Sequence, residues 1–250
     1  MLDIDLNADV GEGVGPDDDA AILDVVTSAS VACGFHAGDP ARMRRTVELA
    51  RQRGVVIGAH PSYADRAGFG RRPLDVAPAQ VAADVLYQLG ALEALARAAG
   101  TAVRYVKPHG ALYHRMADDA ACARAVVEAV ASIRDDLVLL VAPASVALQV
   151  ATACGLRAVA EGFADRAYLP DGRLAPRDTP GAVITDASLV AERAVALAVE
   201  HSIPATDGTP VRVEARSICL HGDTPGSASL ARAVRSALEG AGVTLAPFAP

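Results

Sequence analysis

The sequence contains no tryptophan, few aromatic residues and a single lysine. Aromatic residues make up 4% of the 250 residues, whereas hydrophobic residues make up 52%. A core built from this composition must rely on small aliphatic side chains, which favours the packed helices and strands of an α/β protein over a β-sandwich. A chain of this length is compatible with one domain, and we expect residues 1–250 to form a single domain.

The sequence also lacks the features of exported, membrane-spanning and nucleic-acid-binding proteins. The four cysteines are widely spaced without a C-x-x-C pair, which argues against a zinc knuckle and a disulfide framework. The N-terminus has no basic region followed by an apolar run, and no segment offers about 18 consecutive apolar residues. The formal net charge of −7 opposes general binding to nucleic acid or an anionic membrane. We therefore expect a cytoplasmic protein without nucleic-acid or membrane partners, for which a homo-oligomer remains open.

Short apolar runs alternate along the chain with longer segments of helical spacing. This pattern predicts repeated βα units and a parallel sheet. The predicted strands are 4–7, 30–33, 55–58, 103–106, 138–141, 158–160 and 217–220. The predicted helices are 40–53, 78–99, 118–132, 145–153, 186–201 and 227–241, and the long loops are 61–77, 162–181 and 202–216. Periodicity alone does not decide between a closed barrel and an open doubly wound sheet.

Titratable or strongly polar residues follow the predicted strands at the points where they end. In chain order they are Asn7, Asp9 and Glu12, then His36 and Asp39, His60, Lys107 and His109, Glu161, and His221 and Asp223. If the strands are parallel, these ends lie on one face, where barrel enzymes place catalytic groups and open α/β sheets bind ligands. A lone histidine beside a turn is often structural, but four histidines converging on one face predict a functional site.

Lys107 is the only lysine among 23 basic residues. It lies two residues before His109, so on an extended segment both side chains point to the same face. An ammonium beside a carboxylate and an imidazole can stabilise negative charge that develops on an amide or phosphoryl oxygen. The alternative is a solvated surface lysine.

Asp9 and Glu12 are candidates for a general base. Two neighbouring carboxylates repel each other, which can raise the pKa of one of them into the range that suits activation of water. The alternative is that Asp9 caps a turn and that Glu12 alone is available for chemistry.

Arginines in two glycine-containing loops are candidates for binding an anion. Arg71 and Arg72 offer paired guanidinium groups that suit a carboxylate or phosphate, although ion pairs with Asp65 or Asp75 are equally compatible with the sequence.

A second loop, after the predicted strand 158–160, brings together Glu161, Asp165 and Arg166, with Arg177 further on. We expect at least one ion pair within this loop to be structural.

Seven blocks of the sequence resemble the signature blocks of the LamB/YcsF family. They are DLNAD followed by GE at 5–12, ACGFHAGD at 32–39, GAHP at 58–61, GFGRR at 68–72, KPHGALY at 107–113, FADR at 163–166 and HGDT at 221–224. The blocks occur in the family's order and extend over nearly the whole chain, which makes the resemblance more specific than any single motif.

The resemblance implies a seven-stranded β/α barrel, similar to a TIM barrel, of the glycoside hydrolase/deacetylase type. It also implies a component of an ATP-dependent 5-oxoprolinase, which acts with subunits B and C to convert 5-oxo-L-proline to L-glutamate. The implied cofactor is ATP with Mg²⁺ at the level of the complex, and the implied small-molecule substrate is 5-oxoproline.

From this likeness we assign hypothetical roles. Asp9 or Glu12, with His36 or His60, would activate water. Lys107 and His109 would stabilise the developing oxyanion, and Arg71 or Arg72 would hold a carboxylate or phosphate. The full set of candidate substrate-binding residues is Asn7, Asp39, Arg71, Arg72, Tyr113, Glu161, Asp165, Arg166, Arg177, His221 and Asp223.

Two other functions are compatible with the same residues. Asp9, His36 and His60 form an Asp/His/His set of the kind that related barrels use for a divalent metal, which would make the protein a metal-dependent deacetylase or amidohydrolase. A bound catalytic metal is not our primary expectation. The other alternative is a non-catalytic subunit that binds the substrate for its partners.

Overall fold

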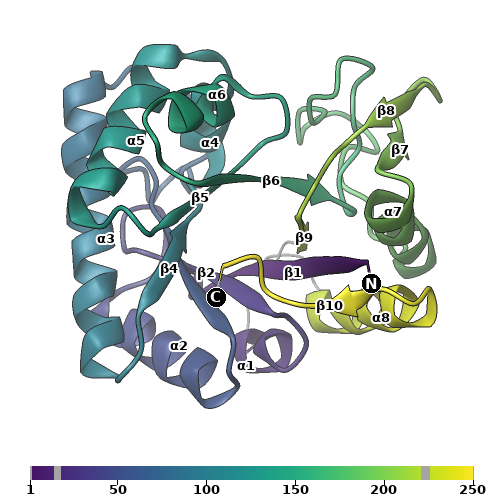
Figure 1. Ribbon diagram of the computed structural model, residues 1–250, viewed down its shortest axis with the longest axis horizontal. Coiled ribbons are helices and arrows are strands. Elements are labelled where there is room, and N and C mark those ends of the chain that lie inside the picture. The colour runs from purple at the N-terminus through teal and green to yellow at the C-terminus, as the bar shows by residue number, and fades with distance from the viewer. Residues whose placement is uncertain (1, 14–17, 221–225, 250) are drawn as a thin grey trace.

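Seven parallel strands close into a barrel in a computed structural model of the chain (Figure 1). The structure describes residues 2–13, 18–220 and 226–249. Around the barrel the strands are β1 (Asp3–Val10), β2 (Ser28–Ala32), β3 (Val56–His60), β4 (Val103–Val106), β5 (Val138–Val141), β6 (Ala158–Phe163) and β9 (Ser217–Leu220). Pairing of β1 with β9 closes the ring. The predicted seven-stranded β/α barrel is therefore confirmed, and an open doubly wound sheet is excluded.

Helices cover the outside of the barrel. They are α1 (Asp18–Leu23), α2 (Pro40–Gln52), α3 (Pro78–Ala98), α4 (Gly110–Asp118), α5 (Ala120–Ile133), α6 (Val146–Ala153), α7 (Ala187–Val199) and α8 (Ser227–Gly240). Helix α3 packs against α5 and α7 packs against α8, on opposite sides of the barrel in Figure 1. Proline begins α2 and α3 because the first helical position needs no backbone N–H. Within the described ranges no helix is both long and apolar enough to cross a membrane.

Some short elements were not predicted from the sequence. The predicted loop 202–216 contains an antiparallel hairpin of β7 (Ser202–Pro204) and β8 (Pro210–Arg212), and β10 (Thr244–Leu245) pairs with the beginning of β1. Helix α1 has only six residues, too few for a helical period to be recognised. Helix α4 begins within the KPHGALY block, where the polar residues suggested a site and obscured the helical pattern.

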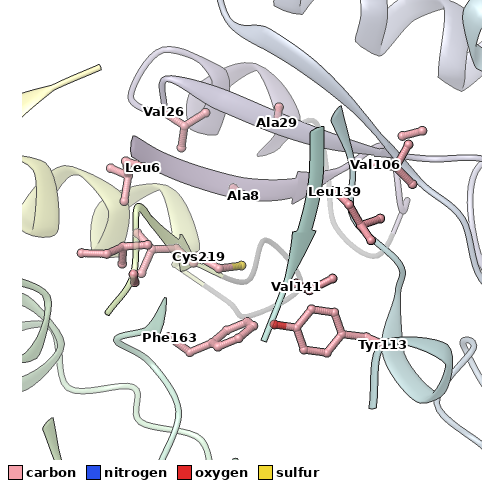
Figure 2. Close-up of a cluster of buried hydrophobic side chains, with 14 of the residues drawn as sticks. Leu6, Ala8, Val26, Ala29, Val106, Tyr113, Leu139, Val141, Phe163 and Cys219 are labelled. Carbon is pink, nitrogen blue, oxygen red and sulfur yellow. The ribbon is translucent and has the colours of Figure 1, made fainter. Parts of the chain in front are cut away.

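Alternation along the strands separates an outer layer from the barrel interior. On β1, Leu6 and Ala8 belong to the hydrophobic layer between strands and helices, whereas Asn7 and Asp9 contact Lys107 inside the barrel. Figure 2 shows members of this hydrophobic layer, among them Leu6, Ala8, Ala29, Leu139 and Val141. The apolar side chains of β1 therefore face the surrounding helices, and its polar side chains face the inside of the barrel.

The amino-terminal end of the barrel is filled by an apolar cluster. Tyr105, Val138 and Leu140 pack there with Phe248 from the C-terminal segment, and the rings of Tyr105 and Phe248 lie 5.0 Å apart. Gly58 on β3 makes room for the Tyr105 ring, because an added Cβ would overlap that ring. Because this end is filled, polar groups inside the barrel can reach solvent only at its carboxyl end.

Candidate active site

The Lys107 ammonium lies inside the carboxyl end of the barrel among four polar groups. Its Nζ lies 3.0 Å from Asp9 Oδ1 and 3.1 Å from Glu161 Oε2. The same ammonium donates to Asn7 Oδ1 at 3.3 Å and to Cys219 Sγ at 2.9 Å. Burial lowers the pKa of Lys107, but the nearby acidic groups outweigh this effect and hold the pKa well above its usual value. Lys107 is thus a fixed, buried cation and not a solvated surface lysine.

Further hydrogen bonds hold the partners of Lys107 in place. Asn7 Nδ2 donates to Ser217 Oγ at 2.7 Å and to Glu161 Oε2 at 3.4 Å. Burial raises the pKa of Glu161, although the charge of Lys107 opposes the rise. Burial, and then the proximity of Glu161, also raise the pKa of Tyr113 well above its usual value, so the phenol keeps its proton. The rings of Tyr113 and Phe163 point toward one another at this end of the barrel (Figure 2), with centroids 6.0 Å apart.

Backbone carbonyls fix the protons on His60 and His109. His60 Nδ1 lies 2.6 Å from the carbonyl oxygen of Lys107, and His109 Nε2 lies 2.8 Å from that of Phe69. A carbonyl oxygen only accepts, so each of these nitrogens carries a hydrogen. The remaining nitrogens, His60 Nε2 and His109 Nδ1, lie 2.9 Å apart. Burial, and then the neighbouring histidines, hold the pKa of His109 well below its usual value, which keeps the ring neutral.

His36 lies against the same pair. Its ring stacks on that of His109 with centroids 3.9 Å apart and an interplanar angle of 4°, and its Nε2 lies 3.2 Å from Glu12 Oε1. Burial, and then His60, lower the pKa of His36 to about 2. Asp9 Oδ2 lies 3.4 Å from His60 Nε2. The predicted meeting of these strand-end side chains around one point is confirmed, while their catalytic roles remain predictions.

One group of side chains in the described part of the chain has the spacing of metal ligands. Glu12, His36, His60 and His109 each offer a ligand atom, and these atoms lie within 4.8 Å of one another. The set differs from the predicted one, because Asp9 directs Oδ1 toward Lys107 while Glu12 and His109 join the two expected histidines.

A cavity of about 370 Å³ opens at this end of the barrel. Its volume falls within the range of small-molecule sites, roughly 300 to 1,000 Å³. The charged or titratable residues of the lining are Asp9, His60, Arg71, Lys107, His109, Tyr113, His114, Arg166 and Arg177. Four of these side chains are arginine or lysine and one is a carboxylate, so the cavity suits an anionic ligand.

Arg72 and Asp39 are predicted binding residues that contact other parts of the protein instead of lining this cavity. Arg72 forms an ion pair with Asp65, in which the guanidinium Nε lies 3.0 Å from Oδ1. Asp39 is the N-cap of α2 and accepts a hydrogen bond from the backbone N–H of Arg42 at 2.9 Å. Neither residue lines the cavity in the described structure, and both have structural partners there, so their binding of substrate stays a prediction.

Three further predictions concern the loops after β6 and β9. Arg166 lines the cavity, but its guanidinium donates to the carbonyl oxygens of Ala175 at 2.6 Å and Ala182 at 3.2 Å, which shapes the loop. Asp165 is buried and does not line the cavity. Burial lowers the pKa of the neighbouring Arg166 to about 10, and the charge of Asp165 opposes this shift. His221 and Asp223 lie outside the described residues.

The sequence analysis assigned no role in the site to Asp5, Cys219 or Phe69. Asp5 accepts hydrogen bonds from Thr27 Oγ1 at 2.6 Å and Ser28 Oγ at 2.8 Å, and burial raises its pKa to about 6. Polar residues at alternate positions 5, 7 and 9 were the available signal for Asp5. Cys219 lies in an apolar strand, and Phe69 contributes a backbone carbonyl, so neither shows in a side-chain pattern.

Comparisons with known proteins agree with this architecture. The chain is 56% identical over 252 residues to the A subunit of the 5-oxoprolinase from Kocuria rhizophila, covering 100% of both chains. It is 46% identical to a lactam utilization protein from Thermus thermophilus, whose crystal structure aligns with a TM-score of 0.93 over 99% of this chain and 100% of that one.

A more distant likeness shows the barrel type. The family 4 carbohydrate esterase from Streptomyces lividans aligns with a TM-score of 0.53 at 10% identity, over 99% of this chain and 93% of that one. This likeness concerns the fold alone and agrees with the closed β/α barrel. The sequence profile of the LamB/YcsF family matches residues 4–250. The chain therefore belongs to the LamB/YcsF family.

Proposed function

We propose that this chain is the A subunit of a 5-oxoprolinase, and that its cavity binds 5-oxo-L-proline and opens the cyclic amide. The names of its full-length relatives support the substrate. The observation that carries the proposal is the buried ion pair of Lys107 with Asp9 at the edge of a cation-rich cavity. Such a site offers a carboxylate for water and positive charge for an anionic substrate.

The proposed reaction needs ATP because a five-membered lactam is a stabilised amide. The lactam oxygen attacks the γ-phosphorus of ATP, and ADP leaves. Water then adds to the activated carbon, the carbon–nitrogen bond breaks and the nitrogen takes a proton, which leaves an acyl phosphate. A second water releases phosphate and completes L-glutamate. We propose that ATP acts with Mg²⁺ at the level of the complex and that subunits B and C are the partners.

We assign the activation of water to Asp9. Asp9 lines the cavity beside His60, whereas Glu12 and His36 do not line it in the part of the chain that the structure describes. Lys107 holds Oδ1 at 3.0 Å, so the carboxylate has a defined orientation toward the cavity. A general base must lie within hydrogen-bond reach of the water it deprotonates. Because Asp9 lines the cavity, a water bound there beside it would meet this condition.

We assign electrostatic stabilisation to Lys107 and not to His109. Lys107 is a permanent cation that lines the cavity. The hydrogen of His109 is on Nε2 and is directed to the Phe69 carbonyl, while the pKa of the ring is well below its usual value. Neutral His109 therefore has no hydrogen to donate toward an oxyanion from Nδ1. This assignment replaces the donor role expected for His109 from the sequence.

We assign the substrate carboxylate to Arg71 and Arg177, which line the cavity. Arg71 also lies over the Phe69 ring, with Cζ 4.8 Å from the centroid, and this contact holds the guanidinium near the opening. Guanidinium groups recognise carboxylates through paired hydrogen bonds, so they would set the orientation of the lactam ring.

The test is formation of L-glutamate from 5-oxo-L-proline, measured with this chain alone and with subunits B and C, each with and without MgATP. We expect glutamate only from the complete mixture with MgATP. A complete mixture that shows no dependence on this chain would refute the proposal. Glutamate formation without ATP would refute the phosphorylation step alone.

A non-catalytic binding subunit is the competing function. It predicts that variants of Asp9 lose 5-oxo-L-proline binding and complex activity together. Our proposal predicts that Asp9→Asn keeps substrate binding, measured by calorimetry, while the complex loses turnover.

A further inference from the structure

Two acceptor nitrogens face each other at the edge of the cavity. His60 Nε2 lies 2.9 Å from His109 Nδ1, and in the neutral rings neither carries a hydrogen, because the carbonyls of Lys107 and Phe69 hold the hydrogens on the far nitrogens. Asp9 Oδ2, also an acceptor, lies 3.4 Å from the same His60 nitrogen. Lone pairs this close repel each other unless they share a cation. The arrangement therefore calls for either a shared proton or a bound metal ion.

Glu12 and His36 complete a set of four donors around this contact. His36 Nε2 lies 3.2 Å from Glu12 Oε1, and His109 Nδ1 lies 3.6 Å from that oxygen. With metal–nitrogen bonds of about 2.0 to 2.1 Å, neighbouring ligand atoms of a tetrahedral site lie roughly 3.3 Å apart. The observed separations of 2.9, 3.2 and 3.6 Å lie on both sides of that value. All four ligand atoms lie within 4.8 Å of one another, so coordination would draw the more distant of them closer together.

The surroundings of the two facing histidines resemble those of metal ligands. Each donates its far N–H to a backbone carbonyl, which is a common way in which a ligating histidine is oriented and its free nitrogen made more basic. A shared proton would satisfy only the contact between His60 and His109. A metal ion would use all four donors, and Glu12 would partly neutralise its charge.

We propose that Glu12, His36, His60 and His109 form a four-coordinate site for a divalent transition metal of the zinc class. Three imidazole nitrogens and one carboxylate oxygen suit Zn²⁺, whereas Mg²⁺ and Ca²⁺ prefer sites built from oxygen. With four protein ligands the site is of the closed, structural kind.

The site would fasten four successive strand ends together beside the cavity. Glu12 follows β1, His36 follows β2, His60 ends β3 and His109 follows β4. When bound, the ion supplies positive charge next to Asp9 and keeps the His60 and His109 rings in place. The site does not depend on the proposed reaction, because it belongs to this chain alone and is measured without substrate, ATP or partner subunits.

The test is metal binding by the isolated, chelator-treated chain. Titration with Zn²⁺ in a calorimeter should show one ion per chain, and Mg²⁺ at the same concentration should show none. Co²⁺, used as a spectroscopic probe, should give the visible absorption of a tetrahedral site with nitrogen ligands. One equivalent of Zn²⁺ should raise Tm, because a ligand that binds only the native state stabilises it.

Variants locate the ion. Glu12→Gln and His109→Asn should each weaken Zn²⁺ binding by about tenfold or more. His201→Asn is the matched control: it also removes one histidine, its position is outside the four-residue group, and asparagine tolerates the backbone φ of +52° there. If circular dichroism shows that a variant does not fold, the Co²⁺ spectrum and the Tm shift of the wild-type chain still test whether the site binds a metal. No Zn²⁺ uptake, or uptake unchanged in both site variants, would overturn the proposal in favour of a shared proton.

Discussion

Lys107 and Asp9 form an ion pair inside the barrel, with Nζ 3.0 Å from Oδ1 and both side chains less than a tenth exposed. They come from positions 98 residues apart, so the pair links β1 to the segment after β4. Removing one member of a buried pair leaves the other charge without compensation, which costs more than the pair itself contributes. The pair therefore couples the stability of the barrel to the electrostatics of the cavity.

Lys107→Ala should lower turnover of the assembled complex by about tenfold or more, because the cavity loses its central cation. It should also lower the free energy of unfolding by about 3 to 5 kcal/mol, as Asp9 and Glu161 lose their shared partner. Glutamate formation and urea unfolding measure the two effects. Arg104→Ala is the control, since it removes an exposed cation from β4, the strand that Lys107 follows. Near wild-type turnover in a folded Lys107 variant would remove the lysine from the mechanism.

How well the strand bounds could be predicted depends on whether the polar side chains of a strand point into the barrel. The predicted strands 103–106, 138–141 and 217–220 match the structure, because in each of them the apolar run begins and ends where the strand does. Strands β1 and β6 are longer than predicted, since Asp9 and Glu161 point into a polar interior and interrupt the apolar run without ending the strand. Polar side chains inside the barrel thus make the predicted strands too short at their carboxyl ends.

The meeting of strand-end residues could be predicted because parallel strands end on a common face. The choice between Arg71 and Arg72 could not, since it depends on how the backbone turns at Phe69 and Gly70, which both have positive φ. The protonated nitrogen of His109 could not be predicted either, because it is determined by a backbone carbonyl.

Asp5→Asn should change how stability depends on pH. The pKa of Asp5 is raised from 3.8 to about 6 by burial, so between these values the native state holds a proton that the unfolded state has lost. The stabilisation from this proton is complete below about pH 3.8 and is lost as the pH rises through about 6. The asparagine side chain does not titrate, so the variant should gain about 2 kcal/mol relative to wild type between pH 4 and pH 7.

Urea unfolding at both pH values measures this difference, and Asp135→Asn on an exposed turn is the control. A difference between Asp5→Asn and wild type that stays constant with pH would show that Asp5 titrates normally in the native state.

Gly70→Ala should disrupt the histidine cluster. Gly70 has φ +65°, and an added Cβ would lie 2.9 Å from both His109 Cδ2 and His36 Cβ and would overlap Ser62 Oγ. The substitution should reduce turnover by about tenfold or more by separating the stacked rings of His36 and His109. Gly100→Ala is a matched control, because φ is +74° there and the added Cβ meets no atom within 4 Å. Equal effects on turnover would attribute the loss to backbone strain alone.

Arg71 and Arg72 provide the sharpest comparison, because neighbouring arginines have different surroundings. Arg71 lines the cavity, while Arg72 is held by Asp65. A hydrogen bond to a charged group contributes about 1.5 to 3 kcal/mol, so Arg71→Ala should raise KM for 5-oxo-L-proline by about tenfold or more, with a smaller effect on kcat. Arg72→Ala should leave KM within about twofold of wild type and lower Tm, because Asp65 loses its partner. Steady-state kinetics of the complex and thermal unfolding of the chain separate the two outcomes. A larger rise in KM for Arg72→Ala than for Arg71→Ala would mean that the loop 61–77 rearranges on binding and directs the second arginine to the substrate carboxylate.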